Sequence, residues 1–148
     1  IGTILGATVD NQITARFERR RVLAVAGSDS PFVFIWDEDV VACMVRAATG
    51  GPAGIYNLAG DGAVGVNELA SVLGKRLLTL PAWLLTAALA VAKPVKLTRY
   101  GPEQVGFLRY RPVLSNARLK REFGFVPSKT SRQALEAWKS AREESASS

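Results

Sequence analysis

Hydrophobic positions recur along this chain with two different periods. Short apolar runs bounded by glycine or proline predict strands, and longer segments with apolar residues three or four apart predict helices. The predicted strands are residues 1–7, 22–26, 32–36, 55–59 and 77–80. The predicted helices are residues 10–20, 37–48, 67–73, 82–92, 102–108, 117–123 and 132–142, with a frayed polar end at 143–148. Strands and helices alternate with short connections, which predicts an α/β fold.

The ends of several predicted helices carry residues that suit those positions. Asp10, Asn116 and Thr130 stand where an N-cap side chain can accept a hydrogen bond from a main-chain N–H group. Pro102 occupies a first helical position, and Gly124 follows the last residue of a helix. These boundaries support the α/β pattern from local chemistry alone.

The composition is that of a globular domain in a reducing environment. The chain has 148 residues, of which 48% are hydrophobic and 22% are charged, enough for one ordinary domain with a buried core. The one cysteine, Cys43, cannot form a disulfide within the chain and is expected to be a small core residue. We therefore expect a cytoplasmic protein. Because there is no histidine, the commonest metal ligand is missing and we expect no metal site.

The net charge of +6 favours contact with anions, but the pattern of charges is not that of a nucleic-acid-binding protein. The basic run 19–21 is expected to be a solvated helix end. The apolar segment 82–92 is too short to span a bilayer and carries no basic residue of its own, so we expect a buried or pocket-lining helix and no membrane contact.

The first residues, Ile1 to Gly6, form an apolar run without an initiator methionine. Domain boundaries are usually polar and flexible. We therefore expect this segment to be an interior strand of a longer chain rather than a natural start. No signal peptide is expected, because no charged stretch precedes the apolar run.

Four motifs occur in an order that resembles a known family. Residues 3–6 (TILG) are similar to the pattern N-x-x-G, and residues 34–41 (FIWDEDVV) are similar to F-I-H-V-x-D-V-A. Residues 54–60 (GIYNLAG) are similar to G-x-Y-N-x-G. Residues 116–127 (NARLKREFGFVP) are similar to D-x-x-K/R-x-x-x-E-L-G-W-x-P. Together they span the chain and resemble the C-terminal portion of extended short-chain dehydrogenases/reductases, the NAD-dependent epimerase/dehydratase family. The resemblance implies that residues 1–148 are part of a doubly wound Rossmann-type sheet plus a small mixed substrate-binding lobe.

The resemblance also shows what the chain does not carry. The family's G-x-x-G-x-x-G loop, whose backbone binds the dinucleotide pyrophosphate at a helix N-terminus, is absent from the sequence. None of the three tyrosines, Tyr56, Tyr100 and Tyr110, has a lysine four residues later, as the family's Y-x-x-x-K pair requires. We therefore expect no catalytic residue here. NAD or NADP is implied for the parent protein, and neither is expected to bind this chain alone.

The family resemblance places Ile1, Gly2 and Thr3 beside the nicotinamide ring of the cofactor, with Thr3 also facing the substrate. Gly2 would allow close backbone approach, and Thr3 replaces the usual asparagine. The alternative is an ordinary buried strand. Asp39 falls at the family's aspartate position, where a carboxylate in the first turn of a helix is expected to satisfy main-chain N–H groups rather than to act in catalysis.

Three further residues are candidates for substrate contact. Phe32 stands where nucleotide-sugar-binding members carry a diphosphate-binding arginine, so the resemblance implies a site less suited to nucleotide sugars. Arg109 lies near the family's second phosphate-binding arginine, and Arg111 competes for that role. A solvated basic loop is the alternative for both arginines.

The implied function is the substrate-binding portion of an NAD(P)-dependent epimerase/dehydratase or reductase for a small carbonyl or alcohol substrate, inactive as this fragment. The alternative is a non-catalytic binding or interaction module derived from that family. Because strands 1–7 and 55–59 would leave unpaired edges, we expect them to pair with the missing N-terminal half or with another copy of the chain.

Overall fold

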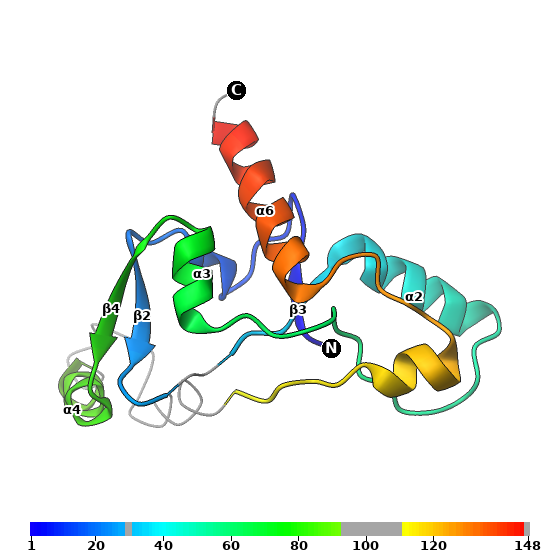
Figure 1. The fold of residues 1–148 in the computed structure, drawn as a ribbon, viewed down its shortest axis with the longest axis horizontal. Coiled ribbons are helices and arrows are strands. Elements are labelled where there is room, and N and C mark those ends of the chain that lie inside the picture. The colour runs from blue at the N-terminus through cyan, green and yellow to red at the C-terminus, as the bar shows by residue number, and fades with distance from the viewer. Residues whose placement is uncertain (29–30, 93–110, 147–148) are drawn as a thin grey trace. The chain divides into compact units, whose positions relative to one another are not determined.

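The computed structural model describes residues 1–28, 31–92 and 111–146 (Figure 1). Its elements are β1 (Thr3–Leu5), α1 (Thr14–Phe17), β2 (Arg21–Val25), β3 (Phe34–Trp36), α2 (Asp37–Thr49), α3 (Val66–Val72), β4 (Arg76–Leu80), α4 (Ala82–Ala92), the π-helix η1 (Leu119–Phe123) and α6 (Ser131–Ala146). The predicted α/β organisation is confirmed. The predicted helix 102–108 lies outside the described residues.

The chain divides into two compact units. The first comprises Ile1–Glu18, Phe32–Val64 and Val113–Ser148, and the second Arg19–Pro31 and Gly65–Pro112, each described only over the ranges given above. In the first unit β1 and β3 pair in parallel, with residues 3–5 opposite 34–36. In the second unit β2 and β4 pair in parallel, with residues 21–25 opposite 76–80. Each unit is therefore built around one pair of parallel strands.

The first unit has a core with two parts. One part is aliphatic and sulfur-containing and consists of Ile35, Val40, Cys43, Leu58, Leu119 and Phe123. Cys43 is buried as predicted, and this burial raises the pKa of its thiol. The other part is a cluster of four aromatic rings, Phe17, Phe32, Phe34 and Trp138, in edge-to-face and stacked contacts. The core thus ties β3 to both α1 and α6.

A buried serine joins three segments of this unit. Ser131, at the start of α6, accepts a hydrogen bond from the N–H group of Phe34 at 3.2 Å and donates from Oγ to the carbonyl of Gly62 at 2.9 Å. The N–H group of Gly60 donates to the carbonyl of Phe34 at 2.8 Å. A Cβ atom at Gly60 would lie 2.8–2.9 Å from main-chain atoms of Phe34, Lys129 and Ser131. Glycine is therefore the residue that lets these three segments meet.

Two predicted helix ends are confirmed. Thr130 caps α6: its Oγ1 accepts a hydrogen bond from the N–H group of Gln133 at 3.2 Å, and Gln133 Oε1 accepts one from the N–H group of Thr130 at 3.0 Å. This reciprocal pair is a capping box. Gly124 ends η1 in the left-handed region, with φ +71°.

The prediction for residues 10–20 is wrong in extent and in cap. Helix α1 covers only Thr14–Phe17, because Asn11 rather than Asp10 organises the turn before it. The Oδ1 atom of Asn11 accepts hydrogen bonds from the N–H groups of Ile13 at 2.9 Å and Thr14 at 3.0 Å. The carboxylate of Asp10 is instead held in an ion pair with Arg142.

The prediction of a strand at 55–59 is also wrong. Ile55 is 86% exposed, and the segment does not form a ladder with another strand in the described structure. Only its end joins the first unit's strand pair, since the N–H group of Gly2 donates to the carbonyl of Leu58 at 2.8 Å.

The prediction that Asn116 is an N-cap is wrong as well. Its side chain does not cap the following helix but donates to the carbonyl of Ala59 and to Asp61 Oδ1, both at 2.8 Å.

In the second unit, α4 has the predicted bounds but is not buried throughout. Leu85 and Leu89 pack on Val25 of β2, whereas Trp83 on the same helix is 71% exposed. The alternating burial of a surface helix is therefore present even though nearly every α4 residue is apolar. Across the described ranges, no helix combines the length and the apolar character needed to cross a membrane.

Candidate functional site

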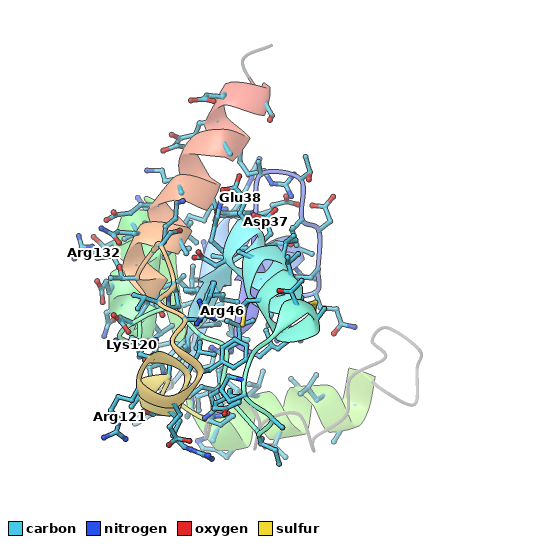
Figure 2. All side chains as sticks on the ribbon, turned by 90° about the vertical axis from the view of Figure 1, so that its right-hand side faces the viewer. Asp37, Glu38, Arg46, Lys120, Arg121 and Arg132 are labelled. Carbon is cyan, nitrogen blue, oxygen red and sulfur yellow. The ribbon has the colours of Figure 1, made fainter. Side chains whose placement is uncertain are left out.

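The candidate site of the first unit is the edge where β1 and β3 end. Ligands of open α/β sheets bind outside the carboxyl ends of parallel strands. Gly6 follows β1 and Asp37 follows β3, and the Asp37 carboxylate fills the space that a Cβ atom at Gly6 would need. Glu38 is exposed beside it and donates its N–H group to Asp37 Oδ1 at 2.9 Å (Figure 2). This edge therefore offers carboxylates at the N-terminus of α2, where the helix dipole favours negative charge.

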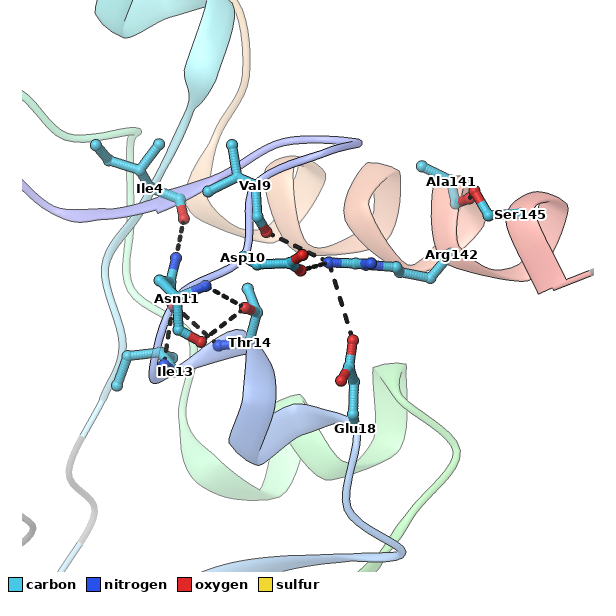
Figure 3. A network of polar contacts seen from close by, with 10 residues as sticks. All are labelled: Ile4, Val9, Asp10, Asn11, Ile13, Thr14, Glu18, Ala141, Arg142 and Ser145. Carbon is cyan, nitrogen blue, oxygen red and sulfur yellow. Dashed lines mark hydrogen bonds and ion pairs between the residues drawn. The ribbon is translucent and has the colours of Figure 1, made fainter.

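The loop after β1 is shaped by one asparagine. Asn11 Nδ2 donates to the carbonyl of Ile4 at 2.9 Å, which folds the loop back on its own strand (Figure 3). The N–H group of Asn11 donates to Thr14 Oγ1 at 2.8 Å, and Thr14 Oγ1 donates to the carbonyl of Asn11 at 2.9 Å. Residues 6–13 therefore have a defined course next to the strand ends.

The same loop is also held by α6. Arg142 Nη2 donates to the carbonyl of Val9 at 3.4 Å and forms an ion pair with Asp10, and Glu18 Oε1 lies 3.9 Å from it (Figure 3). The guanidinium is about one-third exposed, whereas both carboxylates face solvent more fully. The last helix of the chain thus fixes the first loop.

The structure brings the three cofactor candidates to the start of β1. Ile1 is 62% exposed and Thr3 is half-buried. The close backbone approach expected at Gly2 is made by the chain itself, since a Cβ atom there would lie 3.1 Å from the Val33 carbonyl oxygen and 3.6 Å from Ala59 Cβ. Of the three residues, the side chains of Ile1 and Thr3 remain available to a ligand.

Phe32, a candidate for substrate contact, is 7% exposed. Its ring stacks on Phe34 at a centroid distance of 5.6 Å and meets Phe17 edge-on at 5.5 Å. Its main chain forms an antiparallel bridge with Val64, with two hydrogen bonds of 2.8 Å. The structure therefore places Phe32 in the core of the first unit, and substrate contact by this ring remains a prediction.

The structure describes one of the two arginine candidates. Arg109 lies outside the described residues. Arg111 belongs to the second unit and is half-buried. Their role in substrate binding remains a prediction.

Asp39 has the structural role that was expected, with a different partner. Its Oδ1 accepts a hydrogen bond from the N–H group of Ser128 at 2.9 Å, and its Oδ2 accepts one from Ser128 Oγ at 3.1 Å. The carboxylate therefore ties α2 to the segment before α6 instead of satisfying N–H groups of its own helix.

A second polar cluster lies around Asp61. Lys120 Nζ lies 2.7 Å from Asp61 Oδ1, and Asn116 Nδ2 donates to the same oxygen at 2.8 Å. The hydrogen bond from Lys120, followed by that from Asn116, lowers the pKa of the Asp61 carboxyl. This cluster connects the turn at 60–62 to η1.

The lowered pKa of Asp61 predicts a stability change at acid pH. A depressed folded-state pKa contributes stability above the unfolded value of about 3.9, and this contribution is lost as the pH falls through the folded-state pKa. Asp61→Asn is expected to remove that part of the acid dependence, worth at most about 1 kcal/mol because the pair is partly solvated. Urea unfolding at neutral and acid pH measures it. Lys120→Met should retain part of the loss of stability at acid pH, because the hydrogen bond from Asn116 to Asp61 remains. If Asp61→Asn loses as much stability at acid pH as the unchanged protein, Asp61 is not the group responsible.

Sequence reasoning missed the residues that hold this site together, Asn11 and Arg142. Asn11 carried one local signal, because asparagine three residues before a threonine is suited to a turn that caps a helix. Arg142 carried none, since its partners Val9, Asp10 and Glu18 lie 133, 132 and 124 residues away. Over the described ranges, no group of three or more His, Cys, Asp or Glu side chains is arranged to hold a metal ion. The groups established at the edge are the carboxylates of Asp37 and Glu38, which suit hydrogen bonding to a polar ligand.

Comparison with solved structures shows the same fold in proteins crystallised with UDP-glucose, with NAD and UDP, and with NADPH. A UDP-glucose 4-epimerase from Thermotoga maritima, crystallised with UDP-glucose, matches 98% of this chain with a TM-score of 0.64 and 16% identity. The Bordetella bronchiseptica enzyme WbmG, in complex with NAD and UDP, matches 97% with a TM-score of 0.63 and 12% identity. RMD from Pseudomonas aeruginosa, complexed with NADPH, matches 96% with a TM-score of 0.56 and 19% identity. The likeness is one of fold.

The match covers only part of each of these proteins. The chain spans 45%, 41% and 46% of the three solved chains. A curated protein of Mycobacterium tuberculosis, described as uncharacterized, is 22% identical over 136 residues, which is 92% of this chain and 36% of that protein. No family model matches the sequence. The expected Rossmann-like α/β class is therefore confirmed, and the solved relatives of this fold are considerably longer.

Proposed function

We propose that the chain is the substrate-binding portion of an NAD(P)-dependent epimerase/dehydratase or reductase that acts on a small carbonyl or alcohol substrate. The main support is the fold, which matches nearly the whole chain to enzymes crystallised with NAD or NADPH. The four motifs in family order support the same conclusion independently of the fold. The dinucleotide would accept or supply the hydride, and the chain would hold the substrate.

Within this proposal, Ile1 and Thr3 face the reacting groups. The exposed apolar side chain of Ile1 suits one face of a nicotinamide ring, and the Thr3 hydroxyl can donate to or accept from a substrate oxygen. Gly2 would serve by letting β1 pack closely on Val33 and Ala59. Arg109 and Arg111 would bind an anionic group of the substrate, whereas Phe32 lacks the donors that a diphosphate requires.

The proposal includes a second portion of protein that packs against β1 and residues 55–59. Support comes from Ile1 and Ile55, which are large apolar residues left exposed in the first unit. The partner would be the dinucleotide-binding half, with a second copy of this chain as the alternative. Such a half would carry the glycine-rich loop and the tyrosine–lysine pair.

Fluorescence titration with NADH and NADPH tests this function. The 148-residue chain alone is expected to show no measurable binding, and the longer natural polypeptide that contains it is expected to bind one of the two. In that longer protein, Thr3→Ala should lower kcat/KM about tenfold through one lost hydrogen bond. Thr49→Ala, at the exposed end of α2, is the matched control and should not change it.

A longer protein that binds neither dinucleotide would contradict the proposal. That result would favour the alternative, a non-catalytic binding or interaction module with the same fold. Retained binding of substrate with no turnover would point the same way.

A further inference from the structure

The strand pair of the second unit has one covered face and one open face. Strand partners in register point their side chains to the same side of a sheet, and successive residues alternate between sides. One face therefore carries Val22 and Ala24, which are buried, and the other carries the pair Leu23 and Leu78, which are 40% and 36% exposed. Since the leucine pair is open, α3, which packs on both strands, lies on the face of Val22 and Ala24.

The open face ends under α4. Val25, on the same face as Leu23, packs on Leu85 and Leu89 of α4, which lies at the carboxyl ends of β2 and β4 (Figure 1). The side of α4 that does not touch the strands exposes Trp83, Leu84 and Val91. Exposed apolar residues therefore lie both on the open face and on the adjoining helix.

The opposite end of the open face is basic. Arg21 and Arg76 are register partners, so two like charges stand side by side, and both are exposed. Like charges directly opposite on adjacent strands are destabilising unless an anion lies between them. Arg19 and Arg20 precede β2 and are exposed as well. Within the described residues, none of these four arginines forms an ion pair. Among the described residues of the second unit, the only acidic side chain is Glu68, and it belongs to α3 on the other face.

We propose that this open face of the second unit docks on an anionic lipid surface. The four arginines would contact lipid phosphates, and Trp83, Leu84 and the leucine pair would enter the headgroup region. Tryptophan and leucine beside arginine are the composition that interfacial membrane contacts use. The helix lacks cations of its own, which is why the sequence indicated no membrane contact, but the adjacent strands supply them.

Other occupants fit this face less well. A nucleic acid would use the arginines but would leave the exposed apolar residues without a partner. A second copy docked through the same open face would cover the apolar residues but would add four more arginines to the interface. The lipid surface matches both halves of the face, and this conclusion does not depend on the proposed enzymatic function.

Vesicle binding by the full chain tests the proposal. The probes are vesicles of phosphatidylcholine alone and of phosphatidylcholine mixed with phosphatidylglycerol, with binding followed by co-sedimentation and by tryptophan emission. Trp36 and Trp138 are buried, so a blue shift on binding reports mainly on Trp83. We expect binding to the mixed vesicles, weakening as salt is added, and little binding to phosphatidylcholine alone.

Two variants with the same change in charge separate this face from general basicity. Arg76→Glu is expected to lower the partition coefficient at least about fivefold, the effect of one lost cation at a membrane surface. It places a carboxylate opposite Arg21, a favourable cross-strand pair, so the loss cannot be ascribed to unfolding. Arg121→Glu, at an exposed position of η1 in the first unit, should leave binding almost unchanged. Trp83→Ser should weaken binding and abolish the blue shift.

Three results would overturn the proposal. The first is equal binding to both kinds of vesicle, and the second is an equal loss in Arg76→Glu and Arg121→Glu. The third is no binding to the mixed vesicles; binding to a synthetic RNA, or a dimer in gel filtration that Trp83→Ser dissociates, would then identify the other occupant.

Discussion

Gly60→Ala is expected to lower the free energy of unfolding by about 3 kcal/mol, at the upper end of the cost of overpacking a core. The new methyl group would meet three main-chain atoms, those of Phe34, Lys129 and Ser131, at 2.8–2.9 Å. Main-chain atoms cannot rotate away as the end of a side chain can, so whole segments must shift. The Gly60 to Phe34 hydrogen bond of 2.8 Å would lengthen with them. Urea denaturation followed by circular dichroism measures the effect.

Gly62→Ala is the matched control in the same turn. Gly62 has φ +74°, but a Cβ atom added there would meet no other atom within 4 Å, so alanine costs only the left-handed backbone conformation, about 1 kcal/mol. Equal losses in the two variants would mean that the close contacts at Gly60 carry no special energy.

Phe34→Ala is expected to destabilise the chain by about 3–5 kcal/mol, the range for removing a fully buried phenylalanine. The ring has no exposed surface, stacks on Phe32 at 5.6 Å and meets Phe17 edge-on at 5.9 Å. Its removal leaves a cavity at the junction of β3, α1 and α6. The same denaturation measurement applies.

Phe34→Leu separates volume from ring geometry. Leucine keeps much of the buried volume and the main-chain bonds of β3, so about 1–1.5 kcal/mol is expected. A loss in Phe34→Ala no larger than in Phe34→Leu would show that the surrounding rings close over the cavity. Because Gly60 and Phe34 are in direct contact, their combined variant should not give the sum of the two single effects.

The elements that were predictable from sequence are those whose signals are local. Helix α2 has its acidic first turn, α4 has its bounding proline, and α6 has its threonine–glutamine capping box, so each could be placed to within a few residues. Segment 55–59 misled because its apolar run has the composition of a strand, while pairing depends on a neighbour that composition cannot show. At residues 10–20, both Asp10 and Asn11 have side chains suited to a cap. In the structure Asn11 forms hydrogen bonds with Thr14, whereas Asp10 pairs with Arg142.

The candidate site was predictable only in its location. Gly6 and Asp37 follow two strands that the apolar runs indicated, and the parallel pairing of β1 and β3 brings those strand ends together, whereas Thr3 lies at the opposite end of β1. The contacts that shape the site join distant parts of the chain, such as Asp61 with Lys120 and Asp39 with Ser128, which are 59 and 89 residues apart. The periodicity of apolar residues predicts local helices and strands, but it does not predict which residues far apart in the sequence will be in contact.

The guanidinium of Arg142 couples α6 to the loop at residues 6–13. Arg142 lies in the last turns of α6, which ends at Ala146, and Ser145 Oγ donates to the carbonyl of Ala141 at 2.9 Å within that stretch (Figure 3). Terminal helical turns open more readily than the rest of a fold. When these turns unwind on warming, the loop at residues 6–13 loses its outer tether. The ligand-facing edge would then soften long before the aromatic core melts.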